Sequence, residues 1–341
     1  MADVAIVGAG PVGLYLASLL QKDLDVLVLD ASRTLGRKAD SGLYSTHLEE
    51  HVPLRKEWVQ HKVRAAVLSS PHARVRVEKP ATAAYVVNRE RFQQWLAGRL
   101  DAPPRLAERV ERLQVDSKVT LHTSKGKHEA SLLIGADGAS SVVRKHWGIL
   151  PQERLNGLIA LTQEPCQDDH VDLLFDKSKI PDGFFWRIPR GETTEYGALG
   201  KNVQFPLLAR FFGLRAFEQH AAFMNAGLIP TAFPRTLLVG EAACQVKPWS
   251  FGGIIFGFTA ARLAAQTIRQ AFRRQDFSQP FLQQYDDAWK QAFGGTISLG
   301  LSLREVFRAM TNPGLDALFR KLGKMDLRQA DMDFPSLEVF G

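Results

Sequence analysis

Cysteine is scarce in this sequence: its 341 residues include only Cys166 and Cys244. The two are far apart and form no CxxC pair, which argues against a zinc ribbon or a dithiol redox centre and fits a reducing compartment. No stretch reaches the roughly 18 consecutive apolar residues of a membrane span. No basic segment precedes the apolar residues at the N-terminus, as it would in a signal peptide. These absences predict a cytoplasmic protein without a metal site.

Acidic residues are fewer than basic ones, 36 against 43, and the formal net charge is +7. The basic residues are scattered, with small groups at 269–274 and 320–324. The sequence lacks the basic stripe with interleaved aromatics that marks a nucleic-acid-binding module, so nucleic acid is not an expected partner. Two interpretations of the charge stay open. One is an ordinary solvated surface, and the other is attraction to a phosphorylated substrate or to anionic lipids at the inner face of the membrane.

The first 30 residues have the pattern of a dinucleotide-binding βαβ unit. An apolar strand runs into GAGPVG, a helical segment follows, and a second apolar strand ends on Asp30. In such a unit Gly8 permits the tight turn, Gly10 lets a pyrophosphate approach the backbone, and Gly13 lets the helix pack on the strand. The acid at the second strand's end accepts a hydrogen bond from a ribose hydroxyl, and the helix N-terminus stabilises the phosphates. The pattern predicts a bound dinucleotide without saying which one.

Period-two alternation between residues 62 and 77, and short strands between 158 and 203, indicate antiparallel β-structure outside the βαβ unit. The chain then returns to a buried strand near 237 and to a strongly amphipathic helix at 256–274. We therefore expect an α/β fold: a Rossmann-like domain, a second antiparallel β-sheet domain and C-terminal helices. The expected boundaries are 1–60, 86–150 and 228–275 for the first domain, 61–85 and 151–227 for the second, and 276–341 for the helical region.

Three glycine-containing stretches at strand ends resemble the FAD signatures of the flavoprotein superfamily that includes p-hydroxybenzoate hydroxylase and the geranylgeranyl reductases. They are VGAGPVG near the start, LLIGADGASSVVR at 132–144 and LLVGEAACQVKPWSFGG at 237–253. The resemblance implies that FAD is the cofactor and that it is bound by a discontinuous domain. Glu241 stands where the third signature usually has an aspartate.

Two further segments resemble the geranylgeranyl reductases in particular. FFWRIP, with Trp186, is similar to their aromatic-x-Trp-x-Phe-Pro strand, although it also fits the Trp-x-Trp-x-Ile-Pro strand of flavin-dependent halogenases. The loop RKADSGLYSTHLEE is similar to the reductase loop that lies against the flavin, with Asp40 in place of a cysteine that this loop often carries. Arg89, at a helix start, is similar to an arginine expected near the cofactor.

The resemblance and the βαβ pattern together give a set of residues expected to bind FAD. They are Gly8, Gly10, Pro11, Val12, Gly13, Asp30, Ala31, Arg37, Ser41, Gly42, Arg89, Asp137, Gly138, Gly240, Glu241, Pro248, Gly252, Gly253 and Ile254.

A reductase of this kind would hold a prenyl double bond against the flavin in a dry apolar site and supply a proton. The residues expected to take part in catalysis are Asp40, Tyr44, His47 and Trp186, and His47 has an ordinary pKa closest to neutral. The resemblance implies an isoprenoid lipid or quinone substrate, with NADPH or a ferredoxin as electron donor. Two alternatives stay open: a class A flavin monooxygenase or halogenase acting on an aromatic substrate, and a non-catalytic prenyl-binding protein with the same fold.

Overall fold

The computed structural model describes residues 1–36 and 40–334, and the chain divides into two compact units. The first unit comprises Met1–Arg37, Glu90–Glu153 and Asn225–Gly300; the second comprises Lys38–Arg89, Arg154–Met224 and Leu301–Gly341. The first unit is discontinuous in sequence. The division differs from the expected boundaries. Residues 40–60 fall in the second unit, and the expected helical region is divided, with residues 276–300 in the first unit and 301–334 in the second.

A seven-stranded sheet, counted within the described residues, forms the centre of the first unit, in the order β16-β17-β10-β1-β2 with β9 and β8 continuing from β10. Strands β1, β2, β10 and β17 run parallel to one another, while β8, β9 and β16 pair antiparallel. Its strands are β1 (Ala2–Val7), β2 (Val26–Leu29), β8 (Val110–Val115), β9 (Val119–Thr123), β10 (Gly126–Gly135), β16 (Ala232–Phe233) and β17 (Thr236–Leu238). The parallel core confirms the Rossmann-like prediction.

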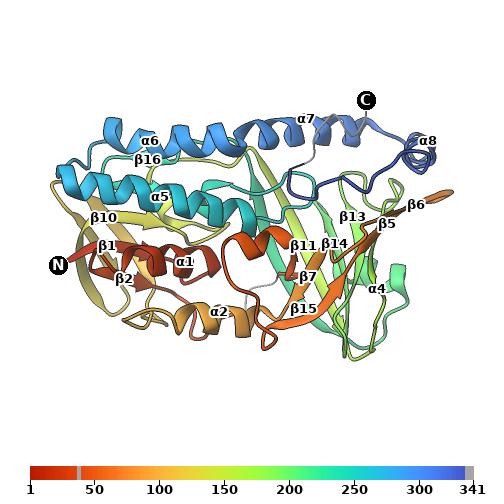
Figure 1. Ribbon diagram of the computed structural model, residues 1–341, viewed down its shortest axis with the longest axis horizontal. Coiled ribbons are helices and arrows are strands. Elements are labelled where there is room, and N and C mark those ends of the chain that lie inside the picture. The colour runs from red at the N-terminus through yellow and green to blue at the C-terminus, as the bar shows by residue number, and fades with distance from the viewer. Residues whose placement is uncertain (37–39, 335–341) are drawn as a thin grey trace. The chain divides into compact units, whose positions relative to one another are not determined.

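Helices pack beside this sheet, and α1 and α5 lie against each other (Figure 1). The helices of the first unit are α1 (Pro11–Leu20), α2 (Arg89–Ala97), α3 (Val142–His146), α5 (Ile254–Arg274) and α6 (Gln279–Trp289), with a short 3-10 turn at Gly240–Ala243. A π-helical turn, Lys290–Gly294, leads into α7 (Gly295–Ala309), which ends in the second unit.

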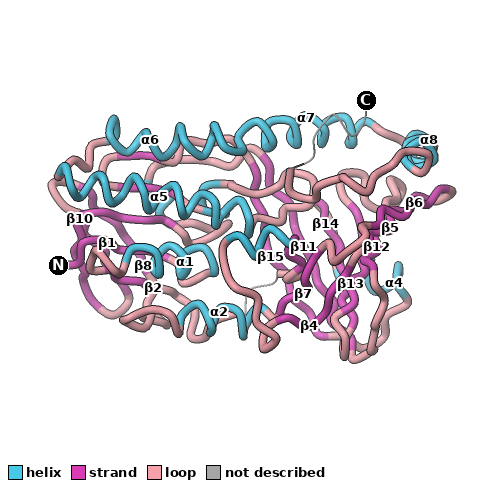
Figure 2. Tube along the Cα trace, viewed as in Figure 1, coloured by secondary structure: helices cyan, strands magenta, loops and turns pink. Residues whose placement is uncertain are grey.

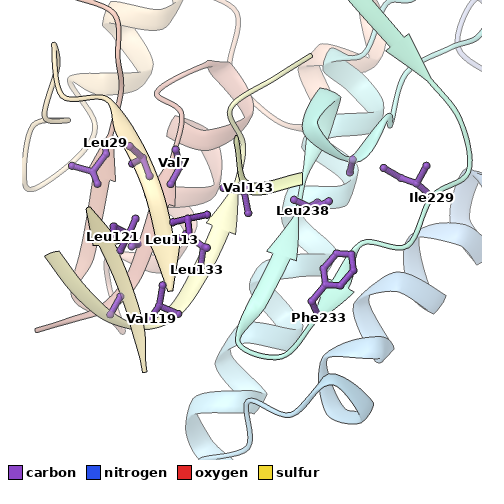
Figure 3. Close-up of a cluster of buried hydrophobic side chains, with 14 of the residues drawn as sticks. Val7, Leu29, Leu113, Val119, Leu121, Leu133, Val143, Ile229, Phe233 and Leu238 are labelled. Carbon is purple, nitrogen blue, oxygen red and sulfur yellow. The ribbon is translucent and has the colours of Figure 1, made fainter. Parts of the chain in front are cut away.

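One apolar cluster fixes the sheet of the first unit in place (Figure 3). Val7 and Leu29 come from the βαβ strands, Leu121 and Leu133 from the hairpin, and Leu238 from β17, and all are 6% exposed or less. Burying such side chains stabilises the fold by about 1.5–3 kcal/mol each. The cluster joins strands that are remote in sequence, and it thereby positions the glycine turns that follow them.

The second unit contains a mixed seven-stranded sheet, counted within the described residues, in the order β15-β11-β14-β13-β12-β5-β6 (Figure 2). Its strands are β5 (Ala65–Ser70), β6 (Ala73–Glu78), β11 (Glu153–Thr162), β12 (His170–Leu174), β13 (Phe184–Pro189), β14 (Thr194–Gly200) and β15 (Glu218–Ala226). The expectation of a wholly antiparallel sheet was wrong at one pairing. Strand β12 runs parallel to β5, whereas β5 and β6 pair antiparallel as a hairpin. Alternation of apolar and polar residues carries no information on strand direction, so the parallel pairing was not foreseen.

A small sheet, β3-β7-β4, completes the β-structure of the second unit. It consists of β3 (Leu43–Ser45), β4 (Val59–Val63) and β7 (Ala84–Val87), and a 3-10 helix spans Thr46–Glu50. Two helices belong wholly to this unit, α4 (Phe205–Phe212) and α8 (Asn312–Leu322). The sequence analysis did not predict α4 or β15.

None of the helices in the described parts of the chain combines the length and the apolar content needed to cross a bilayer.

Candidate functional site

The first glycine turn has no room for side chains at two of its three glycines. Gly8 has a φ of +109°, and a Cβ there would lie 2.4 Å from the carbonyl oxygen of Ala136. A Cβ on Gly13 would lie 2.0 Å from the carbonyl oxygen of Gly8. At Gly10, by contrast, a Cβ would meet nothing within 4 Å. The turn is therefore packed tightly against the protein on one side and open at Gly10.

Helix α1 begins at this opening with its N-terminus uncapped. Gly10 is the N-cap residue, Pro11 occupies the first turn, and no side chain in the described residues caps the helix. The free N–H groups and the helix dipole make this end favourable for an anion. Asp30 Oδ2 accepts a hydrogen bond from the Ala9 N–H at 2.7 Å, so the acid at the end of β2 lies beside the turn. Ala31, which follows it, is exposed.

The second glycine stretch contains Asp137, whose carboxylate has one oxygen without a hydrogen-bond partner among the described residues. Asp137 Oδ2 accepts a hydrogen bond from the Val142 N–H at 2.6 Å, whereas Oδ1 is buried and has no hydrogen-bond partner within the described residues. Burial raises the pKa of Asp137 despite the hydrogen bonds from Ser141 and the backbone. Gly138, next in sequence, has a φ of +71°. An orphaned buried oxygen of this kind fits a hydroxyl donor from a ligand.

The third stretch forms a tight turn, and α5 begins a short way after it. Gly240 has a φ of +70°, and a Cβ there would come within 3.1 Å of Val12 Cγ1. Glu241 follows in a 3-10 turn and is half-buried, and Pro248 is buried. Gly252 is exposed, Gly253 is the N-cap residue of α5 and Ile254 its first residue, and no described side chain caps this helix either.

Arg144 ties the second and third stretches together. Its side chain donates from Nη1 to the Ala242 carbonyl at 2.9 Å and from Nη2 to the Ala139 carbonyl at 2.5 Å, and the residue is 3% exposed. All three glycine stretches are thus held in one unit. Two uncapped helix N-termini, an opening at Gly10 and the orphaned oxygen of Asp137 fit a dinucleotide that carries both a pyrophosphate and hydroxyl groups.

Asp40 and its neighbours form a charged cluster in the second unit. Arg89 Nη1 donates to Asp40 Oδ2 at 2.5 Å, and the Tyr44 hydroxyl lies 3.3 Å from the same oxygen. The other oxygen of Asp40 accepts from the Gly42 N–H at 2.8 Å. Burial and the charge of Asp40 raise the pKa of Tyr44, so its hydroxyl keeps its proton throughout the physiological range. The structure therefore brings together Asp40, Tyr44 and Arg89, all of which the sequence had singled out.

Gly42 and Ser41 hold this loop against its neighbours. Gly42 has a φ of +64°, and a Cβ there would lie 2.3 Å from the Val87 carbonyl oxygen. The Ser41 carbonyl accepts a hydrogen bond from Arg190 Nη1 at 2.5 Å. Arg37, the remaining loop residue expected to bind FAD, lies outside the described residues.

Arg190 and Glu195 connect this loop to Trp186. Arg190 Nη1 lies 2.7 Å from Glu195 Oε2, and the Trp186 indole N–H donates to Glu195 Oε1 at 2.8 Å. The Glu195 side chain is only 2% exposed. Gly197 on the neighbouring strand leaves space for the indole, because a Cβ there would lie 2.0 Å from the Trp186 ring. Trp186 is thereby fixed in one orientation.

The sequence analysis missed Arg190 and Glu195. Glu195 sits in the strand TEYGALG, where a charged residue among apolar and small ones is a sign of a buried ion pair. Its partner lies only five residues away, across the β13–β14 turn. The residue type alone could have drawn attention to Glu195, but only the hairpin geometry identifies Arg190 as its partner.

His47 contacts the C-terminal segment. Its Nε2 lies 2.8 Å from Asp331 Oδ2 and its Nδ1 lies 2.6 Å from Glu50 Oε1, while the ring of Phe334 meets it edge-on at 5.6 Å. The neighbouring Ser45 hydroxyl donates to Asp333. Both ring nitrogens of His47 are thus engaged with carboxylates, which makes the residue an anchor for residues 331–334.

This anchor predicts a pH-dependent stability. Burial lowers the pKa of His47, but the hydrogen bonds and charges of Asp331 and Glu50 outweigh it and raise the pKa overall. The contribution of His47 to the stability of the folded protein is therefore complete below about pH 6.5, the ordinary pKa of histidine. It is lost as the pH rises through the higher pKa that His47 has in the folded state. We expect proteolytic cleavage near residue 331 to accelerate with rising pH in the wild-type protein. His47→Gln should remove this dependence.

His220→Gln is the matched control. His220 Nε2 lies 3.0 Å from Glu218 Oε1, and no ion pair among the described residues joins His220 to residues 331–334. It should keep the wild-type profile. A cleavage rate that is independent of pH in the wild-type protein would contradict the anchoring role of His47.

Several known proteins are similar to this chain in sequence or in fold. Residues 1–158 match the family described as FAD binding domain. Digeranylgeranylglycerophospholipid reductase 2 of Methanopyrus kandleri is 29% identical over 364 residues, covering 95% of this chain and 91% of that protein. A geranylgeranyl bacteriochlorophyll reductase-like protein of Thermoplasma acidophilum has a solved structure with a TM-score of 0.90 and 20% identity, over 99% of this chain and 94% of that one. Halogenase PltM in complex with FAD has a TM-score of 0.69 and 15% identity, over 90% and 77%.

The FAD-binding family match and the near-full-length relatives together identify an FAD-dependent oxidoreductase. Within that class, the chain is similar over nearly its whole length to digeranylgeranylglycerophospholipid reductases and to a geranylgeranyl bacteriochlorophyll reductase-like protein. The resemblance inferred from the three glycine stretches and the FFWRIP strand is confirmed.

Proposed function

We propose that this protein reduces carbon–carbon double bonds in the polyprenyl chain of a lipid or quinone. The observation that carries the proposal is the near-full-length similarity to digeranylgeranylglycerophospholipid reductases, several of which are 25–29% identical over 89% or more of this chain. The reaction adds a hydride and a proton across the double bond, so that the two carbons gain two hydrogens and the cofactor supplies two electrons.

The glycine stretches of the first unit would hold the FAD. The uncapped start of α1, with Gly10 and Pro11, would bind the pyrophosphate, and Asp30 and Asp137 would accept from hydroxyl groups. Gly252, Gly253 and Ile254 would place the start of α5 near the flavin, where a positive helix end stabilises negative charge. Reduced FAD, when bound, supplies the hydride.

Asp40 and Tyr44 are the proposed proton-bearing pair. The Tyr44 hydroxyl carries a proton and points at Asp40 Oδ2, whose charge is balanced by Arg89. A proton that leaves the Tyr44 oxygen would be replaced from solvent, with Asp40 taking it up and passing it along this hydrogen bond. Trp186 contributes an apolar wall, and its orientation is fixed by Glu195. Both ring nitrogens of His47 are engaged with Glu50 and Asp331. For this reason Tyr44, with Asp40 beside it, is the proposed proton donor.

Anaerobic stopped-flow mixing tests the reaction. The protein is reduced with dithionite and mixed with digeranylgeranylglyceryl phospholipid in detergent, and flavin absorbance and the saturated lipid product are followed. We expect reoxidation that depends on lipid concentration, with none from the saturated lipid. NADPH and a reduced ferredoxin, supplied separately, identify the electron donor. If no prenyl substrate reoxidises the flavin while an aromatic compound stimulates NADPH and oxygen consumption, the protein is instead a monooxygenase or halogenase.

Tyr44→Phe should slow lipid-dependent reoxidation by about 10²–10⁴-fold, the usual contribution of a positioned acid or base. The flavin content should stay unchanged, because the glycine turns of the first unit are not altered. Tyr196→Phe is the matched control: its hydroxyl lies 3.2 Å from Glu164 at an exposed position, and its loss should leave the rate unaffected. Equal rates for Tyr44→Phe and the wild-type protein would exclude Tyr44 as proton donor.

A further inference from the structure

Exposed apolar side chains gather on the last two helices of the second unit. Only six large apolar residues are exposed in the described parts of the chain, and three of them, Leu303, Val306 and Leu318, lie within sixteen positions of one another. Leu303 is 45% exposed, Val306 60% and Leu318 37%. Leu303 and Val306 are three residues apart on α7 and therefore share one face of that helix. Leu318 lies on the next helix, α8, so half of the exposed large apolar residues among those described lie on two consecutive helices. Single exposed apolar residues are normally scattered.

Other residues of both helices are buried in contacts within the second unit. On α7, Arg304 is 4% exposed and donates to the Asp182 carbonyl at 3.1 Å. On α8, Leu315 and Phe319 are buried, and Asp316 accepts from Ser70 at 2.5 Å and from the His72 N–H at 3.1 Å. The outward orientation of Leu303, Val306 and Leu318 is a fixed property of the fold.

Positive charge accompanies the apolar residues. The acidic residues of this segment are already matched: Glu305 pairs with Arg308 at 2.5 Å, Asp326 pairs with Arg328 at 2.5 Å, and Asp316 is buried. Arg320, Lys321 and Lys324 are exposed, and no ion pair to any of them exists in the described part of the chain. Arg320 also donates to the His72 carbonyl at 3.3 Å, and its charge helps to lower the pKa of Asp316. Lys321 and Lys324 therefore carry most of the unpaired positive charge among the described residues of this segment.

We propose that these residues dock the protein on the surface of a membrane that contains anionic lipids. The docking surface comprises Leu303, Val306, Leu318, Arg320, Lys321 and Lys324. Charge complementarity favours this occupant, because exposed cations next to apolar side chains match anionic headgroups above an acyl layer. A protein partner would have to supply an acidic apolar patch of its own. The inference goes beyond the proposed reaction. Membrane docking is measured without turnover, so its test is independent of the test of the reaction.

Vesicle sedimentation tests the proposal on the full-length, FAD-loaded protein. The probes are vesicles of equal parts phosphatidylglycerol and phosphatidylcholine, and vesicles of phosphatidylcholine alone. We expect the wild-type protein to sediment with the anionic vesicles at low salt and to be released as salt screens the charges. Each basic residue near an anionic surface contributes about a fivefold change in binding, so K321Q/K324Q should weaken the partition by about 30-fold. Val306→Asn should weaken it at high and low salt alike.

Two controls separate local docking from general charge and general apolarity. K22Q/K56Q makes the same change in net charge at exposed lysines elsewhere, and Leu150→Ser removes an apolar side chain that is 80% exposed. Both should bind like the wild-type protein, and thermal unfolding verifies that all variants are folded. The proposal is overturned if the wild-type protein does not sediment with anionic vesicles, or if K321Q/K324Q and K22Q/K56Q bind equally. The proposal is also overturned if Leu318→Ser leaves vesicle binding unchanged but lowers the molecular mass measured by light scattering. The surface would then mediate self-association.

Discussion

Replacing Gly13 with alanine is expected to yield a protein that purifies without flavin. The added Cβ would lie 2.0 Å from the Gly8 carbonyl oxygen, which is a backbone atom, so no flexible side chain can move aside to relieve the contact. Helix α1 would have to shift away from the turn after β1. Overpacking of this kind costs about 1–3 kcal/mol, and it displaces the helix N-terminus that is proposed to bind the pyrophosphate. Flavin absorbance at a known protein concentration measures the loss.

Two other glycines make this test specific. At Gly295, the first residue of α7, a Cβ meets nothing within 4 Å, so Gly295→Ala should bind flavin normally and unfold at the same or a slightly higher temperature. Gly10→Ala has equally free space in the protein itself. It should leave the stability of the flavin-free protein unchanged and weaken only the binding of FAD. If Gly13→Ala retains a full complement of flavin, the proposed role of this turn is wrong.

The Rossmann-like half could be predicted because its signals are local. Gly8, Gly13 and Asp30 lie in one continuous segment, and each glycine is required by a contact within a few residues or with the neighbouring strand. The alternating strands of the second unit could be recognised for the same reason. The direction of strand pairing could not be predicted in the same way. Strand β12 pairs parallel with β5, with Ala65 opposite His170, 105 positions away, and alternation says nothing about direction.

The charged cluster shows where local patterns stop being informative. Asp40, Tyr44 and Trp186 were singled out because their segments resemble known motifs. The structure adds that Asp40 pairs with Arg89, 49 residues away, and that Arg190 reaches the Ser41 carbonyl across 149 residues. His47 was a reasonable candidate for a proton donor by its ordinary pKa. Its contact with Asp331, 284 residues away, could not have been read from the sequence.

Glu195→Ala is expected to destabilise the second unit strongly. The carboxylate is 2% exposed and lies 2.7 Å from Arg190, which is itself only 10% exposed. Removal of one partner of a buried ion pair leaves the other charge uncompensated and costs about 3–5 kcal/mol. Urea unfolding, followed by far-UV circular dichroism, measures the loss in free energy of unfolding. Asp168→Asn serves as control, because Asp168 pairs with Arg187 at 2.5 Å at a half-exposed position and should cost at most about 1 kcal/mol.

A double variant decides whether the pair acts as a unit. If Glu195 and Arg190 matter chiefly to each other, Glu195→Leu combined with Arg190→Met should be more stable than Glu195→Leu alone, because no buried charge is left unpaired. The double variant would still lose the hydrogen bond that Arg190 donates to the Ser41 carbonyl and the one that Glu195 accepts from Trp186. We therefore expect stability to recover while lipid-dependent flavin reoxidation stays slow. Strictly additive losses of stability would show that the two side chains act independently, and recovered reoxidation would show that neither the Ser41 loop nor Trp186 needs them.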